Sequence, residues 1–258
     1  MSSKFEKVFD LTGRVALITG GGTGIGKGCA LLLAEAGAKV VIVGRRMEKL
    51  QEVKAVIETN CGHCECVSAD LTVEENCKTA VDAAVRAFGR LDILINSAGG
   101  RGVFGTLEEE FASENICHTM DMDFSSTLYC IKYAYPHLQQ NKVGSIINIS
   151  SLAALRASGP IVYSAAKGAI KSVSKTLGQR FGELGVRVNS IYPGFIVTEM
   201  TEKIYEHPEL VKKYEEDAAL GILGNVDDVA FCALYLSSDA ARFVTGQDFV
   251  IDGGAMCR

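Results

Sequence analysis

No run of apolar residues in this chain is long enough to cross a bilayer, and the first residues, MSSKFEKVFDLTG, lack a signal-peptide core. We therefore expect no membrane insertion and a cytoplasmic location. The chain also lacks a surplus of positive charge, since its formal net charge is −5. Because a phosphate backbone calls for a basic protein face, nucleic acid is not expected as a partner.

Disulfide-scaffold spacing is missing as well, although the 258 residues include nine cysteines. Without an export signal, these are expected to be mostly reduced thiols. One cluster, NCGHCEC at 60–66, places His63 between Cys61 and Cys64 of a CxxC pair. A structural zinc site usually draws its ligands from two knuckles, and no second knuckle follows. We predict no metal site, and interpret the cluster as a loop leading from a helix to a strand that it enters at Val67.

Linkers, repeats and low-complexity segments are absent too, and hydrophobic residues make up 48% of the chain, enough for a large core. Short apolar runs predict strands at 15–18, 39–43, 66–68, 91–95, 144–149, 186–191 and 248–251. Helical patterns lie between them at 27–36, 47–59, 73–88, 108–137, 163–184, 201–219 and 227–236. This alternation predicts a single α/β domain over residues 1–258, a doubly wound parallel β-sheet flanked by helices.

The stretch VALITGGGTGIG at 15–26 predicts a strand, a tight turn and a helix. Gly20 permits the turn, Gly24 lets backbone approach a ligand, and Gly26 lets the helix pack closely on the sheet. The free N–H groups of the helix start would face an anion, best explained by a pyrophosphate. A glycine-rich turn without a ligand has the same pattern, so the remaining strand ends have to support this hypothesis.

Ligands of such sheets lie beyond the carboxyl ends of the strands. The segments at those ends are 20–26, 44–46, 70–71, 96–99, 150–151 and 193–198. Their positions fit one extended ligand that crosses the edge of the sheet.

The end of the second strand indicates which dinucleotide is bound. An acidic side chain there would bind a ribose 2′-hydroxyl, but the strand ends in Gly44, followed by Arg45 and Arg46. Because an arginine pair suits a phosphate dianion, we expect NADP(H) to be preferred over NAD(H). The alternative is that both arginines are merely solvated charge.

Tyr163 and Lys167 are the predicted catalytic pair. They lie four residues apart at the start of a helix and so project from one face. A lysine cation stabilises a nearby phenolate. Tyr163 could then exchange a proton with an alcohol or ketone oxygen while hydride moves to or from a nicotinamide.

Taken together, the motifs resemble the short-chain dehydrogenase/reductase family (SDR) along nearly the whole chain. They are TGGGTGIG at 19–26, Asp70, NSAG at 96–99, NISS at 148–151, YSAAK at 163–167 and IYPGFIVT at 191–198. The resemblance implies a Rossmann-type fold, Tyr163 as general acid/base, Lys167 as phenolate stabiliser and ribose ligand, and a serine that polarises the carbonyl. It also implies a homotetramer or homodimer. The expected cofactor-binding residues are Gly20, Thr23, Gly24, Ile25, Gly26, Arg45, Arg46, Asp70, Leu71, Asn96, Ala98, Gly99, Tyr163, Lys167, Pro193, Gly194, Ile196 and Thr198.

Two positions depart from the family pattern. Ser151 matches the second serine of the family's pair but lies twelve residues before Tyr163, one fewer than usual, whereas Ser150 matches the count. We prefer Ser151 and attribute the difference to a shortened loop. Where the family commonly has an asparagine that holds a relay water, MDMDFSST places Asp123, which we expect to serve the relay with an added charge.

The substrate pocket is expected between 100–106, 152–161 and a lid at about 195–223. Its apolar lid side chains suit a small hydrophobic alcohol or ketone, with a hydroxysteroid or bile acid as the sharpest hypothesis. Alternatives are a 3-oxoacyl thioester reductase, whose carrier would dock near Arg101, a 2,4-dienoyl-CoA reductase-like enzyme, or a non-enzymatic NADP(H) sensor. The lid side chains considered are Phe195, Met200, Ile204, Tyr205, Leu220, Ile222 and Leu223.

Overall fold

A seven-stranded, fully parallel sheet forms the centre of the computed structural model, which describes residues 4–257. Its strand order is β3-β2-β1-β4-β5-β6-β7. The predicted doubly wound α/β fold is therefore confirmed. The strands are β1 (Val15–Thr19), β2 (Lys39–Gly44), β3 (His63–Ser68), β4 (Ile93–Asn96), β5 (Gly144–Ile149), β6 (Val186–Pro193) and β7 (Asp248–Ile251).

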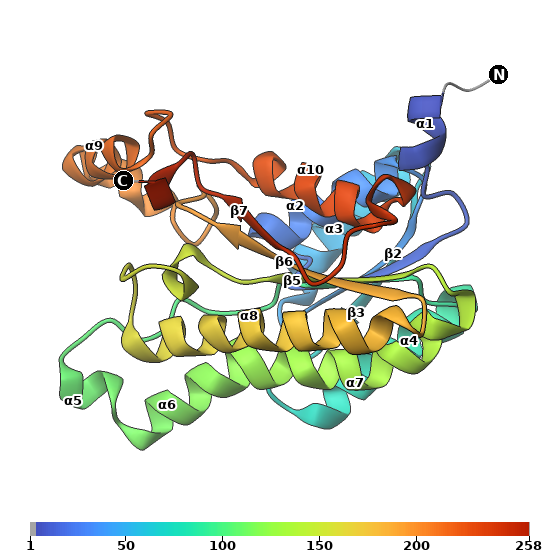
Figure 1. Cartoon of the computed structure of the whole chain (residues 1–258), viewed down its shortest axis with the longest axis horizontal. Coiled ribbons are helices and arrows are strands. Elements are labelled where there is room, and N and C mark those ends of the chain that lie inside the picture. The colour runs from blue at the N-terminus through green and yellow to red at the C-terminus, as the bar shows by residue number, and fades with distance from the viewer. Residues whose placement is uncertain (1–3, 258) are drawn as a thin grey trace.

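Helices cover both faces of this sheet (Figure 1). One face carries α2, α3 and α10, whose apolar side chains share a core with β1 and β2, and the other carries α4, α7 and α8. The helices are α1 (Lys4–Phe9), α2 (Gly24–Glu35), α3 (Met47–Thr59), α4 (Glu74–Phe88), α5 (Leu107–Glu110), α6 (Ser113–Met120), α7 (Ser126–Leu138), α8 (Ile161–Gly182), α9 (Pro208–Asp217) and α10 (Val226–Ser237). No helix among residues 4–257 is long and apolar enough to span a membrane.

The central strands are buried on both faces, which explains why most of their residues are apolar. Every residue of β1, β4 and β5 is buried. In-register parallel pairing, for example Thr19 opposite Val43 and Asn96, brings the carboxyl ends of these strands to one edge. The segments that follow the strands are thereby gathered at that edge.

The cysteine cluster is the main correction to the predicted elements. His63, Cys64 and Cys66 do not form a loop; they belong to β3, where His63 pairs with Lys39 and Ser68 with Gly44. This is an edge strand whose first residues alternate exposed, buried, exposed, with Cys64 as the buried one. The buried side chain at the start of this strand is a cysteine, so the sequence has no run of aliphatic residues there that would predict a strand.

Two predicted helical stretches are in fact broken. Residues 108–137 divide into α5, α6 and α7, with a π-helical turn at Asp121–Ser125 between the last two. Residues 201–219 divide into a 3₁₀ turn at Glu202–Glu206 and helix α9. The π-helical turn inserts an extra residue into the helical ladder, a feature that is frequent at functional sites.

Candidate active site

The glycine-rich turn after β1 has a backbone that side chains would obstruct. Gly20 has a φ of +68°, and a Cβ there would lie 2.9 Å from the carbonyl oxygen of Ser97. A Cβ on Gly26 would collide with the carbonyl of Gly20. These two glycines thus allow α2 and the loop after β4 to close around the turn, as the sequence predicted.

Helix α2 begins at this turn with open amide donors. Thr23 is the N-cap residue in an extended conformation, and its side chain makes no capping hydrogen bond. Gly24 follows with a φ of +54°, and a Cβ on it would lie 3.5 Å from Cγ2 of Thr198. The helix terminus therefore faces the segment after β6, with N–H groups suited to an anion between them.

Polar side chains connect the ends of β1, β4 and β5. The Thr19 hydroxyl accepts hydrogen bonds from the backbone N–H groups of Ser97 at 3.0 Å and Ala98 at 2.9 Å. Asn96 donates from Nδ2 to Oδ1 of Asn148 at 2.9 Å. Its own Oδ1 is buried without a hydrogen-bond partner.

Tyr163, Lys167 and Asp123 come together behind the loop 97–100. The Lys167 ammonium lies 3.2 Å from Oδ1 of Asp123 and 5.6 Å from the ring centroid of Tyr163. Both charged side chains are buried, and Asp123 also accepts the backbone N–H of Gly100 at 3.0 Å. Any Cβ on Gly99 would lie 2.6 Å from Asp123 Oδ1, so glycine is required there.

The buried ion pair determines the charge of Lys167. Burial by itself lowers the pKa of this ammonium, but the Asp123 carboxylate, with Tyr163, more than offsets that effect. The pKa of Lys167 is therefore raised above its ordinary value. A permanent cation is held beside Tyr163, where it can stabilise a phenolate.

The two serines after β5 have different surroundings. Ser150 is buried, and its hydroxyl donates to the backbone carbonyl of Lys167 at 2.9 Å. Ser151 caps the 3₁₀ turn Leu152–Ala154, with Oγ accepting the N–H of Ala153 at 3.2 Å, and it lines a large cavity. Of the two serines, only Ser151 is among the residues that line this cavity.

A cavity of about 300 Å³ lies on the β2 side of the glycine turn. Arg45, Arg46, Asp70 and Leu71 line it together with Gly20, Thr23, Ala98 and Gly99, so eight of the predicted cofactor residues meet there. Asp70 accepts hydrogen bonds from the backbone and hydroxyl of Thr72, which lower the pKa of its carboxyl group. The carboxylate is therefore ionised and fixed in position.

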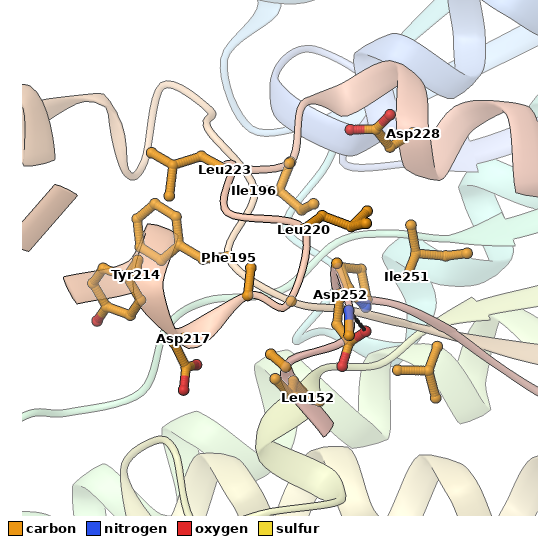
Figure 2. Close-up of a pocket in the computed structure, with 18 of the residues that line it drawn as sticks. Leu152, Phe195, Ile196, Tyr214, Asp217, Leu220, Leu223, Asp228, Ile251 and Asp252 are labelled. Atoms are coloured by element: carbon orange, nitrogen blue, oxygen red, sulfur yellow. Dashed lines mark hydrogen bonds between the residues drawn. The ribbon is translucent and has the colours of Figure 1, made fainter. Parts of the chain in front are cut away.

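A larger cavity, of about 830 Å³, lies on the opposite side of the turn. Side chains from the lid, from the loop after β5 and from the end of β7 converge on it (Figure 2). Phe195 and Tyr214 stack at its side with ring centroids 4.1 Å apart. Predicted cofactor residues Pro193, Gly194 and Ile196 line it as well, so the cofactor segment adjoins the predicted substrate pocket.

The comparisons with known proteins agree with this geometry. Residues 20–256 match the family model described as "Enoyl-(Acyl carrier protein) reductase". The chain is 39% identical to 2,5-dichloro-2,5-cyclohexadiene-1,4-diol dehydrogenase LinX of Sphingobium indicum over 95% of this chain and 96% of that one. It is 35% identical to cyclohexanol dehydrogenase of an Acinetobacter species over 98% and 96%. A short-chain type dehydrogenase/reductase from Mycobacterium ulcerans superposes with a TM-score of 0.92 at 38% identity, covering 96% of this chain and 92% of that one.

The chain belongs to the short-chain dehydrogenase/reductase family. It is an NAD(P)-dependent SDR oxidoreductase that acts on CH–OH groups, as the sequence predicted. The residues present fit the dinucleotide. The start of α2 has no side-chain cap on its N–H groups, and the cavity beside the glycine turn is lined by Arg45 and Arg46, a donor set that suits phosphates.

Three lid residues of this SDR lie elsewhere than predicted. Met200 lines the smaller cavity, Ile204 is buried, and Tyr205 is 60% exposed. They are absent from the lining of the larger cavity because the 3₁₀ turn and α9 interrupt the expected continuous helix. Phe195, Leu220, Ile222 and Leu223 do line it.

The C-terminal segment is the part of the pocket that sequence reasoning missed. Residues 250–255 line the larger cavity, beside the three segments that the sequence predicted for the pocket. Arg156 holds this arrangement together by donating to the carbonyl of Ala255 at 2.6 Å and by pairing with Asp217 at the end of α9. The glycines after β7 gave no indication in the sequence that Arg156 would bind the Ala255 carbonyl.

Proposed function

We propose that this SDR is an NADP(H)-preferring dehydrogenase that interconverts a bulky alicyclic secondary alcohol and its ketone, with hydroxysteroids and bile acids as the best candidates. The observation that carries the proposal is the cavity of about 830 Å³ that opens beside Ser151. It lies in the upper part of the range of ~300–1,000 Å³ typical of drug-sized ligands. Relatives named for ring alcohols, cyclohexanol and a cyclohexadienediol, support a cyclic substrate.

The proposed chemistry needs three polar groups of the chain. Ser151 donates a hydrogen bond to the substrate oxygen, while the Tyr163 phenolate removes the hydroxyl proton during oxidation. Lys167 stabilises the phenolate, and Asp123 keeps Lys167 charged. Bound NADP⁺ supplies the hydride acceptor, and the reverse proton transfer serves ketone reduction.

The cofactor preference rests on the end of β2. Arg45 and Arg46 line the smaller cavity, and the strand ends in Gly44 in place of an acidic residue. A guanidinium favours a 2′-phosphate, whereas a carboxylate there would bind a ribose hydroxyl and repel the phosphate. The remaining contacts of the dinucleotide are proposed for the predicted cofactor residues already described.

A panel of ring alcohols tests the substrate. We expect NADP⁺ reduction, followed by absorbance of the reduced nicotinamide, to be faster with one hydroxysteroid or bile-acid regioisomer than with cyclohexanol. A steroid fills more of the apolar cavity than a single ring, and each buried CH₂ contributes about 0.8 kcal/mol. Equal kcat/KM for cyclohexanol and every larger alcohol would contradict the bulky-substrate part of the proposal.

Replacing Asp123 with asparagine tests its role. The variant keeps an acceptor for the Gly100 N–H but loses the charge that raises the pKa of Lys167. We expect the alkaline limb of the kcat/KM profile to move to lower pH, because the buried ammonium then loses its proton at a lower pH. Asp121→Asn, in the same π-helical turn, makes the same charge change and should leave the profile in place. If Asp123→Asn and Asp123→Ala both left it untouched, the role of Asp123 would be abandoned.

The runner-up is reduction of an acyl thioester, either of a 3-oxo group or of a conjugated double bond. The description of the matching family model as an enoyl-(acyl carrier protein) reductase favours it, and Arg101 is exposed near the predicted entrance. Oxidation of a ring alcohol with no turnover of a 3-oxoacyl or dienoyl thioester would exclude it. A purely NADP(H)-sensing protein does not fit an SDR that retains both Tyr163 and Lys167.

We propose in addition that the protein works as a cytoplasmic homotetramer or homodimer. Exposed large side chains such as Phe231 and Phe243 are consistent with contacts between copies. Light scattering on the purified full chain would measure the assembly directly.

A further inference from the structure

An ion pair connects the predicted phosphate-binding arginines to the start of the lid. Arg46 Nη1 lies 2.9 Å from Oε1 of Glu199, and Nη2 lies 3.2 Å from Oε2. Arg46 is the N-cap residue of α3, directly after β2, whereas Glu199 follows β6. Two parallel N–H···O bonds are the geometry with which a guanidinium also holds a phosphate.

This pair lies at the smaller cavity. Arg46 lines it together with Arg45 and Lys49, and Met200, the neighbour of Glu199, lines it from the lid side. Lys49 is engaged with Glu52 at 3.0 Å. The Glu199 carboxylate therefore pairs with the Arg46 guanidinium in the cavity where the 2′-phosphate is expected to bind.

Charge keeps the Glu199 carboxylate at this place in the free enzyme. Hydrogen bonds from Arg46, and the charges of Arg46, Lys49 and Lys27, lower the pKa of Glu199, so it is ionised at neutral pH. Yet 52% of the Arg46 side chain and 43% of the Glu199 side chain are exposed. Half-exposed pairs are weak and salt-screened, so a dianion that enters the cavity can replace the carboxylate.

We propose that Glu199 is an internal competitor for the 2′-phosphate, occupying Arg46 until NADP(H) displaces it and thereby limiting how strongly the enzyme discriminates NADP(H) from NAD(H). This inference rests on the proposed NADP(H) preference and adds a specificity-determining residue outside the family motifs.

Binding of two nucleotide fragments isolates the effect from catalysis. Adenosine 2′,5′-bisphosphate carries the 2′-phosphate, and adenosine 5′-monophosphate differs from it only in lacking that group. Calorimetric titration of the full chain would compare wild type with Glu199→Gln and with Glu202→Gln, an exposed carboxylate three residues further along. We expect Glu199→Gln to bind the bisphosphate about three- to fivefold more tightly, the range of a surface ion pair, and the monophosphate unchanged.

The outcomes are separable. Equal tightening of both fragments in Glu199→Gln, or the same gain in Glu202→Gln, would overturn the inference. In an Arg46→Gln background the gain from Glu199→Gln should vanish, and its persistence there would also overturn it. A wild type that binds both fragments equally would contradict the proposed NADP(H) preference. Even then, selective tightening in Glu199→Gln would support the competitor role, and its absence would refute it.

Discussion

Replacing Tyr163 by phenylalanine is expected to lower kcat by about 10²–10⁴-fold, the usual contribution of a positioned acid/base group. Only the hydroxyl is lost, so the buried Lys167–Asp123 pair beside the ring should persist. NADPH should therefore still bind, as measured by its fluorescence. The expected result is a bound cofactor with almost no turnover.

The matched control is Tyr133→Phe on α7, which removes a hydroxyl that donates to Glu74 at the start of α4. We expect this variant to keep wild-type kcat. If Tyr163→Phe retained kcat within a few fold, another residue would have to move the proton. If both variants lost activity together with their thermal unfolding transition, the loss would be structural.

Replacing Arg45 by alanine is expected to raise KM for NADP⁺ while KM for NAD⁺ stays unchanged. A hydrogen bond to a charged group contributes about 1.5–3 kcal/mol, which corresponds to roughly 10- to 150-fold in KM. Arg45 follows Gly44 at the end of β2 and lines the smaller cavity. Arg46 has to give up its ion pair with Glu199 before it binds the phosphate, which offsets part of its contribution, whereas no such pair competes for Arg45 in the proposal.

Arg86→Ala, on the exposed face of α4, removes the same charge away from the cavity and controls for net charge. Initial rates at varied concentration of each dinucleotide give both KM values. A wild-type preference for NAD⁺, or an equal change of KM for both dinucleotides in Arg45→Ala, would show that Arg45 does not contact the ribose phosphate.

Much of the fold could be predicted because the central strands are short, mostly apolar segments followed by glycine or polar motifs. Only the end of strand β3, residues 66–68, was predicted, and its start at 63–65 was missed because the buried side chain there is Cys64, between two exposed polar residues. The breaks in 108–137 were missed too, since a π-helical turn preserves helical composition while it shifts the register by one residue. A local sequence pattern indicates whether a segment is a helix or a strand, but it does not show where that element is interrupted.

The candidate site likewise contains residues that the sequence predicted and contacts that it did not. Motif residues such as Gly20, Asn96 and Tyr163 could be predicted as site residues because each belongs to a short local motif that follows a strand. The contact of Arg46 with Glu199 joins residues 153 positions apart, and that of Arg156 with Ala255 joins residues 99 apart. Such contacts depend on how the lid and the C-terminal segment pack, and no local pattern contains that information.

The central claim is hydride transfer between a ring carbinol carbon and the nicotinamide. Its most direct test uses a bicyclic alcohol deuterated at the carbinol carbon, with NADP⁺ and wild-type enzyme, followed by mass spectrometry of the dinucleotide. The account predicts that deuterium appears on the reduced nicotinamide, that the rate shows a primary isotope effect, and that Tyr163→Phe abolishes the transfer. Reduced dinucleotide without the label, or activity confined to the double bond of an acyl thioester, would contradict it.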